Sequence, residues 1–80
     1  MEKKQIEKIV KEIIADKSEY DFVTINEKTN LTEDLGMDSL EKVMVFMEFD
    51  NTFGISIPDD EADNAVTVED CIALVEKYSD

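Results

Sequence analysis

The stretch LGMDSLEK, residues 35–42, places Ser39 between an aspartate and a leucine directly after a glycine-containing turn. A serine hydroxyl in this position can help to start a helix, or it can be the point where another group is attached. The first role is ordinary, because Asp38 can cap the following helix and Ser39 then lies in its first turn. The second role is favoured by position, because free N–H groups at a helix N-terminus bind phosphate and the preceding loop leaves the hydroxyl accessible.

Catalysis by this chain alone is disfavoured by the side chains that it lacks. The 80 residues contain no histidine, so Ser39 has no imidazole base for nucleophilic catalysis. The three lysines beyond residue 17 lie in polar stretches, without the burial that a lysine base requires. Carboxylates are abundant, but a chain of this size leaves little room for a cleft that excludes water. We therefore expect a protein that is not an enzyme.

Metal and redox chemistry are also poorly supported. One cysteine and no histidine exclude a disulfide within the chain and a structural zinc site. Cys71 falls on an apolar stripe, so we expect an unreactive buried thiol. The acidic stretches DNTFG and PDDEAD lack the alternating oxygen ligands and the closing glutamate of an EF-hand loop. We predict no metal site; a small calcium-binding bundle stays open as an alternative.

Charge is distributed unevenly along the chain, whose formal net charge is −13. Residues 1–17 carry five lysines against four acidic residues, whereas residues 18–80 carry three lysines against 17 acidic residues. Such a surface repels nucleic acids and anionic membranes and attracts basic protein surfaces. The N-terminus contains no continuous apolar segment, so we expect a cytoplasmic monomer without a signal peptide or a membrane span.

The chemistry at Ser39 depends on the elements around it. A first helix is predicted over residues 2–17, where aliphatic residues recur at the helical period: Ile6, Ile9, Val10, Ile13 and Ile14. Residues 18–37 are predicted to form a long loop whose scattered apolar side chains pack against the rest of the fold. A short helical turn near residues 31–35 is compatible with this pattern.

A second helix begins at Asp38, because Glu41 three residues later completes a pattern like a capping box, and it ends before Gly54. Its apolar residues cover a wide arc, which predicts a central helix with neighbours on more than one side: Leu40, Val43, Met44, Phe46, Met47, Phe49 and Phe53.

Two further helices complete the fold. Pro58 and the acidic residues after it predict a short helix over residues 58–64, and a last helix begins at the N-cap Thr67 and runs to Tyr78. We predict an all-α, four-helix bundle that forms a single domain over residues 1–80. It has three longer helices, one short third helix and a long loop between helices 1 and 2.

Several motifs follow one another in a fixed order: DLG-x-DSL, an apolar helix, I-x-IP-D and a closing T-V-x-D. With the amphipathic first helix and the long loop, essentially the whole chain resembles the acyl carrier proteins of fatty acid and polyketide synthesis. The resemblance implies that Ser39, between Asp38 and Leu40, carries 4′-phosphopantetheine transferred from coenzyme A by a phosphopantetheinyl transferase. The thiol of this arm would hold acyl groups as thioesters, and separate enzymes would supply the catalysis.

The resemblance also implies where partners and cargo bind. Acyl-transferring, condensing or ligase enzymes with basic patches would dock on acidic residues: Glu41, Glu48, Asp50, Asp59, Asp60 and Glu61. An acyl chain would shelter in an apolar gap between the second helix and the last two: Val43, Met47, Ile57, Ala62 and Ile72. Met44 stands where carriers of fatty acid synthesis usually have an acidic residue, so a specialised acyl-transfer pathway stays open.

Besides the calcium-binding bundle, two alternative functions remain open at this point. The chain can be an aminoacyl or peptidyl carrier, which uses the same arm for different cargo. It can also be an unmodified acidic interaction subunit, whose binding would survive Ser39→Ala whereas the function of a carrier would not.

Overall fold

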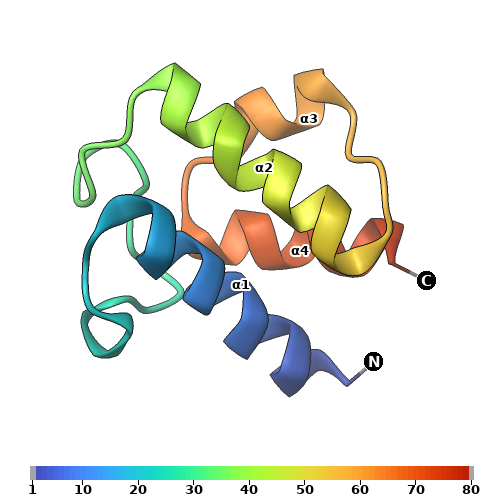
Figure 1. The fold of residues 1–80 in the computed structure, drawn as a ribbon, viewed down its shortest axis with the longest axis horizontal. Helices are drawn as coiled ribbons and strands as arrows, with labels where there is room; N and C mark the ends of the chain where they lie inside the picture. The colour runs from blue at the N-terminus through green and yellow to red at the C-terminus, as the bar shows by residue number, and fades with distance from the viewer. Residues whose placement is uncertain (1, 80) are drawn as a thin grey trace.

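In the computed structural model, which describes residues 2–79, the chain begins with helix α1 (Lys3–Ser18). Three residues of the predicted aliphatic stripe are buried, Ile6, Val10 and Ile14, and the other two are partly buried. Helix α1 uses this face to pack against both α2 (Ser39–Phe53) and α4 (Val68–Tyr78) (Figure 1).

The segment between α1 and α2 contains a 3-10 helix, η1 (Phe22–Thr24), that the sequence did not predict. The turn near residues 31–35 is present, although it is not a regular helix: the N–H of Gly36 donates to a carbonyl four residues earlier at 3.0 Å. Leu31 and Leu35 are buried, so this loop contributes side chains to the core.

Backbone hydrogen bonds fasten the same loop to the start of α4. The N–H of Leu31 donates to the carbonyl of Val66 at 2.9 Å, and the N–H of Val68 donates to the carbonyl of Thr29 at 3.0 Å. The two segments meet in an isolated antiparallel bridge. The residues just before α2 are therefore fixed by main-chain contacts as well as by buried side chains.

Helix α2 starts and ends where the sequence predicted. Asp38 Oδ1 accepts the N–H of Glu41 at 2.8 Å, and Glu41 Oε1 accepts the N–H of Asp38 at 3.2 Å, which completes the capping box. Gly54 follows the helix with a φ of 66°, in the left-handed region that favours glycine.

The predicted apolar arc of α2 is only half buried. Val45, Phe46 and Phe49 face the core, and Val45 was absent from the prediction. Four residues of the arc are exposed by 46–67% of their surface: Leu40, Val43, Met44 and Met47. Helix α2 contacts α1 on one side and α3 (Asp59–Asn64) on another. Because α3 is only six residues long, it still leaves much of the arc open to solvent.

The prediction of an all-α fold is confirmed. Residues 2–79 contain four α-helices, of which α3 alone is short, and the buried residues of all three longer helices form one continuous core. Thr67 caps α4 as predicted, because its hydroxyl accepts the N–H of Asp70 at 3.2 Å. None of the helices within the described range is long and apolar enough to cross a membrane.

Candidate functional site

Ser39 is the first residue of α2, and its side chain is exposed. The N–H groups of Ser39 and Leu40 lie in the first turn, where backbone donors have no carbonyl partner within the helix. The carboxylate of the neighbouring Asp38 accepts the N–H of Glu41 in the helix cap, so its role in this structure is to fix the start of the helix. Leu40 points outward and exposes 67% of its surface.

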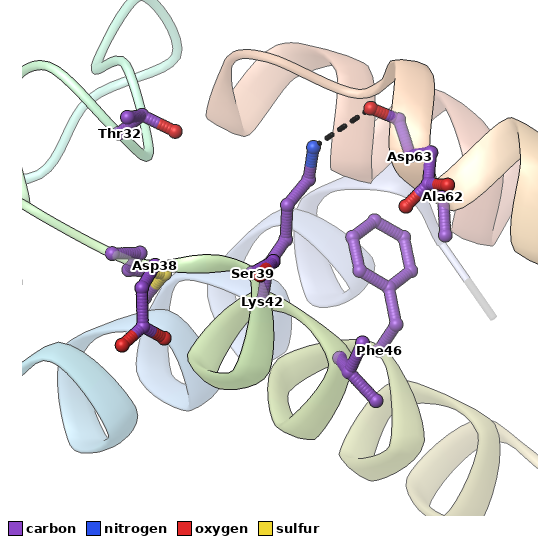
Figure 2. Close-up of a pocket in the computed structure, with 9 residues that line it drawn as sticks. Thr32, Asp38, Ser39, Lys42, Phe46, Ala62 and Asp63 are labelled. Atoms are coloured by element: carbon purple, nitrogen blue, oxygen red, sulfur yellow. Dashed lines mark hydrogen bonds between the residues drawn. The ribbon is translucent and has the colours of Figure 1, made fainter.

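A pocket of about 320 Å³ opens beside Ser39, and we call it the serine pocket. Figure 2 shows the Lys42 side chain rising from α2 towards Asp63 at the end of α3, with the Phe46 ring beside it. The lining comes from the loop, α2 and α3: Thr32, Met37, Asp38, Ser39, Lys42, Val43, Phe46, Ala62 and Asp63. The serine hydroxyl therefore lies at the edge of a partly apolar hollow.

A second pocket, of about 310 Å³, lies between α2 and α3 and is called the α2–α3 pocket below. It shares four lining residues with the serine pocket, so the two hollows adjoin along α2. Its lining is mixed, with apolar walls and an acidic rim: Val43, Phe46, Met47, Asp50, Ile57, Asp59, Ala62 and Asp63.

Four of the five residues proposed to shelter an acyl chain lie together in this second pocket: Val43, Met47, Ile57 and Ala62. Ile72 does not join them. It is buried on the face of α4 that packs against α1, where it borders a shallow depression that includes Lys3 and Glu7. Phe46, which the sequence predicted only as part of the apolar arc of α2, lines both pockets.

The helical period could have identified Phe46 from the position of Ser39. Residues at offsets of three, four, seven and eight from one helical position share a face, which groups Ser39 with Lys42, Val43, Phe46 and Met47. All five line one or both of the pockets. Lys42, which the sequence analysis did not single out, is found by the same rule.

The six acidic residues proposed for docking differ in their availability. Asp59 and Asp60 are exposed in the first turn of α3, and Glu41 and Glu48 are partly buried on α2. Asp50 has an internal partner, because its Oδ1 accepts the N–H of Ile57 at 3.1 Å.

Glu61 is also engaged within the molecule. It accepts hydrogen bonds from the ammonium of Lys77 at 2.8 Å and from the hydroxyl of Tyr78. These two donors hold the pKa of Glu61 below its usual value. Glu61 is therefore ionised at neutral pH and already partnered, which distinguishes it from Asp59 and Asp60.

The other chemically capable groups do not form a reactive centre. Burial raises the pKa of the Cys71 thiol to about 12, so it is protonated and shielded at neutral pH. Within residues 2–79, no group of three or more cysteine, aspartate or glutamate side chains is arranged to hold a metal ion.

Comparison with known proteins adds the deciding observation. A family model described as a phosphopantetheine attachment site matches residues 8–75. An acyl carrier protein from Sinorhizobium fredii (strain NBRC 101917 / NGR234) is 41% identical over 68 residues, which cover 85% of this chain and 87% of the relative. The acyl carrier protein AcpP from Rhizobium meliloti (strain 1021) matches with the same identity and coverage. The chain belongs to the phosphopantetheine-dependent acyl carrier protein family.

Family membership confirms three sequence-based predictions about this carrier. The resemblance to acyl carrier proteins is correct, the prosthetic group is phosphopantetheine, and the protein is a carrier rather than an enzyme. The described residues fit that group. An exposed hydroxyl stands at a helix N-terminus, where the backbone favours a phosphate, beside a hollow with apolar walls.

Proposed function

We propose that this acyl carrier protein is loaded on Ser39 and delivers acyl intermediates to separate enzymes of fatty acid, polyketide or specialised acyl-transfer pathways. One observation supports the proposal above all others. The exposed hydroxyl of Ser39 lies at the edge of a pocket that adjoins the apolar-walled pocket between α2 and α3. The two adjoining pockets support an attachment point that lies beside the proposed shelter for cargo.

The loading reaction is a phosphoryl transfer from coenzyme A. Ser39 Oγ forms a new bond to the phosphorus that carries the pantetheine, the diphosphate bond of coenzyme A breaks, and adenosine bisphosphate leaves. The hydroxyl proton passes to a base on the phosphopantetheinyl transferase, because the carrier has no histidine and, within residues 2–79, no side chain is hydrogen-bonded to this hydroxyl. The exposure of Ser39 gives that second enzyme access to the hydroxyl.

The carrier's own residues position the arm and its cargo. Asp38 fixes the first turn of α2 through its hydrogen bond with Glu41, and thereby fixes the backbone that carries Ser39. When bound, phosphopantetheine supplies a terminal thiol that carries acyl groups as thioesters. The side chains of Ile57 and Phe46, both nearly buried, form the floor against which an apolar cargo can pack.

Docking of partner enzymes is proposed on the exposed face of α2 together with the start of α3. Leu40 and Met44 supply apolar contact area, and Asp59 and Asp60 supply free carboxylates that complement a basic patch. Met44 is 46% exposed, which supports a place on this proposed surface. An apolar residue here supports a dedicated set of partners, and hence the specialised pathway among the three. The monomeric state and the cytoplasmic location remain predictions.

The proposal is tested by intact mass after incubation with coenzyme A and a phosphopantetheinyl transferase of broad specificity. The wild type should gain the mass of one phosphopantetheine, and Ser39→Ala should gain none. Ser56→Ala is the matched control, since Ser56 is another exposed serine in the same chain, and this variant should be loaded like the wild type.

Each alternative has its own result. Loading of folded Ser39→Ala would overturn the assignment of the site. Absence of loading in the folded wild type with several transferases would favour the unmodified interaction subunit. Transfer of an amino acid instead of a fatty acyl group by enzymes added to the loaded protein would favour the aminoacyl carrier.

A further inference from the structure

Lys42 connects the start of α2 to the end of α3. Its Nζ donates to the carbonyl oxygen of Asp63 at 3.0 Å, and both residues line the serine pocket (Figure 2). Carbonyl groups in the last turn of a helix have no N–H partner within the helix, so this oxygen is an available acceptor. In this position Lys42 holds α3 against α2.

Lys42 is also within reach of a group attached to Ser39. The two residues are three positions apart on α2, which places their Cβ atoms about 5–6 Å apart on one face. Both side chains line the serine pocket. A lysine stem spans enough distance to bring Nζ to a phosphate on Ser39 Oγ, or to the Asp63 carbonyl that it now contacts.

The charge around Lys42 makes it distinctive. Residues 18–80 contain only three lysines against 17 acidic residues. Lys77 is paired with Glu61, the one ion pair within the part of the chain that the structure describes. Lys42, in contrast, donates to a neutral carbonyl oxygen, although acidic residues predominate in this part of the chain. An ammonium bound to a neutral acceptor can gain free energy by moving to an anionic one.

We propose that Lys42 is a positioning residue for the phosphopantetheine arm: once Ser39 is loaded, its ammonium leaves the Asp63 carbonyl and pairs with the phosphodiester. The inference rests on the proposed attachment at Ser39. It has a second consequence, because α3 then loses its hydrogen bond to α2 and keeps the contacts of Glu61 with α4. Loading thereby loosens one wall of the α2–α3 pocket, into which an acyl chain would pass.

The test compares unloaded and loaded protein by NMR, with loading verified by intact mass. In the wild type, loading should move the carbonyl ¹³C resonance of Asp63 to the position it has in unloaded Lys42→Met. In Lys42→Met itself, loading should leave that resonance in place. The amide of Ala62 in α3 should exchange about two- to fivefold faster after loading of the wild type, as expected for the loss of one exposed hydrogen bond.

Two further variants separate positioning from a general effect of charge. In loaded wild type, the ³¹P resonance of the phosphodiester should shift with salt, because salt weakens its pairing with Lys42; in loaded Lys42→Met it should not. Lys42→Arg should behave like the wild type in both the Asp63 shift and the ³¹P resonance, because it keeps a cation at the same place. Lys28→Met removes one positive charge from the exposed loop and should behave like the wild type. Far-UV circular dichroism confirms that each variant is folded.

The outcomes distinguish the two proposals. If mass shows no adduct on the wild type, attachment at Ser39 fails and the role of Lys42 falls with it. If the adduct forms but the Asp63 resonance stays in place, or moves equally in Lys42→Met, the proposed function stands and the role of Lys42 is overturned. If Lys28→Met abolishes the shift as well, the effect belongs to net charge and the positioning role is again overturned.

Discussion

Lys77 Nζ lies 2.8 Å from Glu61 Oε1, and this ion pair ties the middle of α3 to the last turn of α4. The Tyr78 hydroxyl donates to the same carboxylate. Helix α3 has no fully buried side chain, and Ala62 alone packs against the core, so the helix depends largely on polar contacts of this kind. Glu61 therefore has a structural role that its position in an acidic stretch does not reveal.

Glu61→Gln should lower the pKa of Tyr78 towards its usual value. In the wild type the Glu61 carboxylate accepts the Tyr78 hydrogen bond and raises that pKa, because ionisation of the phenol would break the bond beside a negative charge. The pKa is measured by NMR titration of the Tyr78 ring. Asp60→Asn is the control, since it removes a charge from the same helix without touching Tyr78. An unchanged Tyr78 titration in Glu61→Gln would contradict the contact.

The stability contributed by Asp70 should depend on pH in a defined direction. The N–H groups of Val66 and Thr67 donate to its Oδ2 and hold its pKa below the usual 3.8. A lowered pKa stabilises the fold above about pH 4, and this contribution is lost as pH falls through the folded-state pKa. Asp70→Ala should cost about 0.5–2 kcal/mol at pH 7, the range for a helix cap.

Denaturant unfolding of wild type and Asp70→Ala at neutral and acid pH measures this difference. The gap in the free energy of unfolding between the two proteins should narrow towards pH 3. Glu69→Ala, in the same turn of α4 but exposed, should unfold like the wild type at both pH values. A gap that stayed constant with pH would show that Asp70 acts through something other than its charge.

Val45→Ala and Val43→Ala make the same change on the two sides of α2. Val45 is fully buried, so its truncation should cost about 1.5–3 kcal/mol. Val43 is 51% exposed, so its truncation should cost less than about 0.5 kcal/mol. Urea unfolding gives both values. Equal losses would mean that the exposed face of α2 is covered in solution.

Cys71 should resist thiol reagents while the protein is folded. Burial raises its pKa to about 12, which leaves almost no thiolate at pH 8. Iodoacetamide should modify unfolded protein readily and folded, unloaded protein far more slowly, as followed by intact mass. Loaded protein should then react once, at the thiol of the arm. Rapid modification of folded, unloaded protein would show that α4 opens locally.

Added salt should raise the melting temperature of the unloaded protein. The excess of acidic residues over residues 18–80 repels itself, and salt screens that repulsion over about 10 Å at 0.1 M. Relief of about 1 kcal/mol corresponds to about 4–8 °C in a domain of this size. Thermal melts from low to moderate ionic strength measure the effect, and a flat series would mean that repulsion does not limit stability.

The sequence predicted the helices well because their signals are local. The capping pairs of Asp38 with Glu41 and of Thr67 with Asp70, and the glycine after α2, act within a few residues. The 3-10 helix η1 escaped prediction because three residues carry no periodicity. Prediction failed mainly where the burial of a side chain depends on the neighbouring element. The apolar pattern of α2 does not reveal how many of its apolar residues a six-residue α3 will cover.

The same limit explains the candidate site. Val43 and Met47 were predicted to line the acyl cavity, and they do lie in the pocket on the face of α2 that they share with Ser39. Ile72 was predicted for the same cavity, but it is on a different helix and borders another depression. Residues at helical spacing share a face in any fold that keeps the helix. The neighbours of Ile72, in contrast, depend on how α4 packs against α1. The internal partner of Glu61 was hidden for the same reason, since Lys77 is 16 residues away.

The backbone bridge between the loop and the start of α4 has a consequence for how this carrier can change. The loop that leads to Ser39 is fastened by main-chain hydrogen bonds of Leu31 and Val68 and by buried residues such as Leu35, none of which lies on the outward face of α2. The exposed side chains on that face can therefore be replaced without moving the serine. On the proposed docking surface, point substitutions at positions such as Met44 would then change which enzymes the carrier serves, while the proposed attachment at Ser39 is inherited intact.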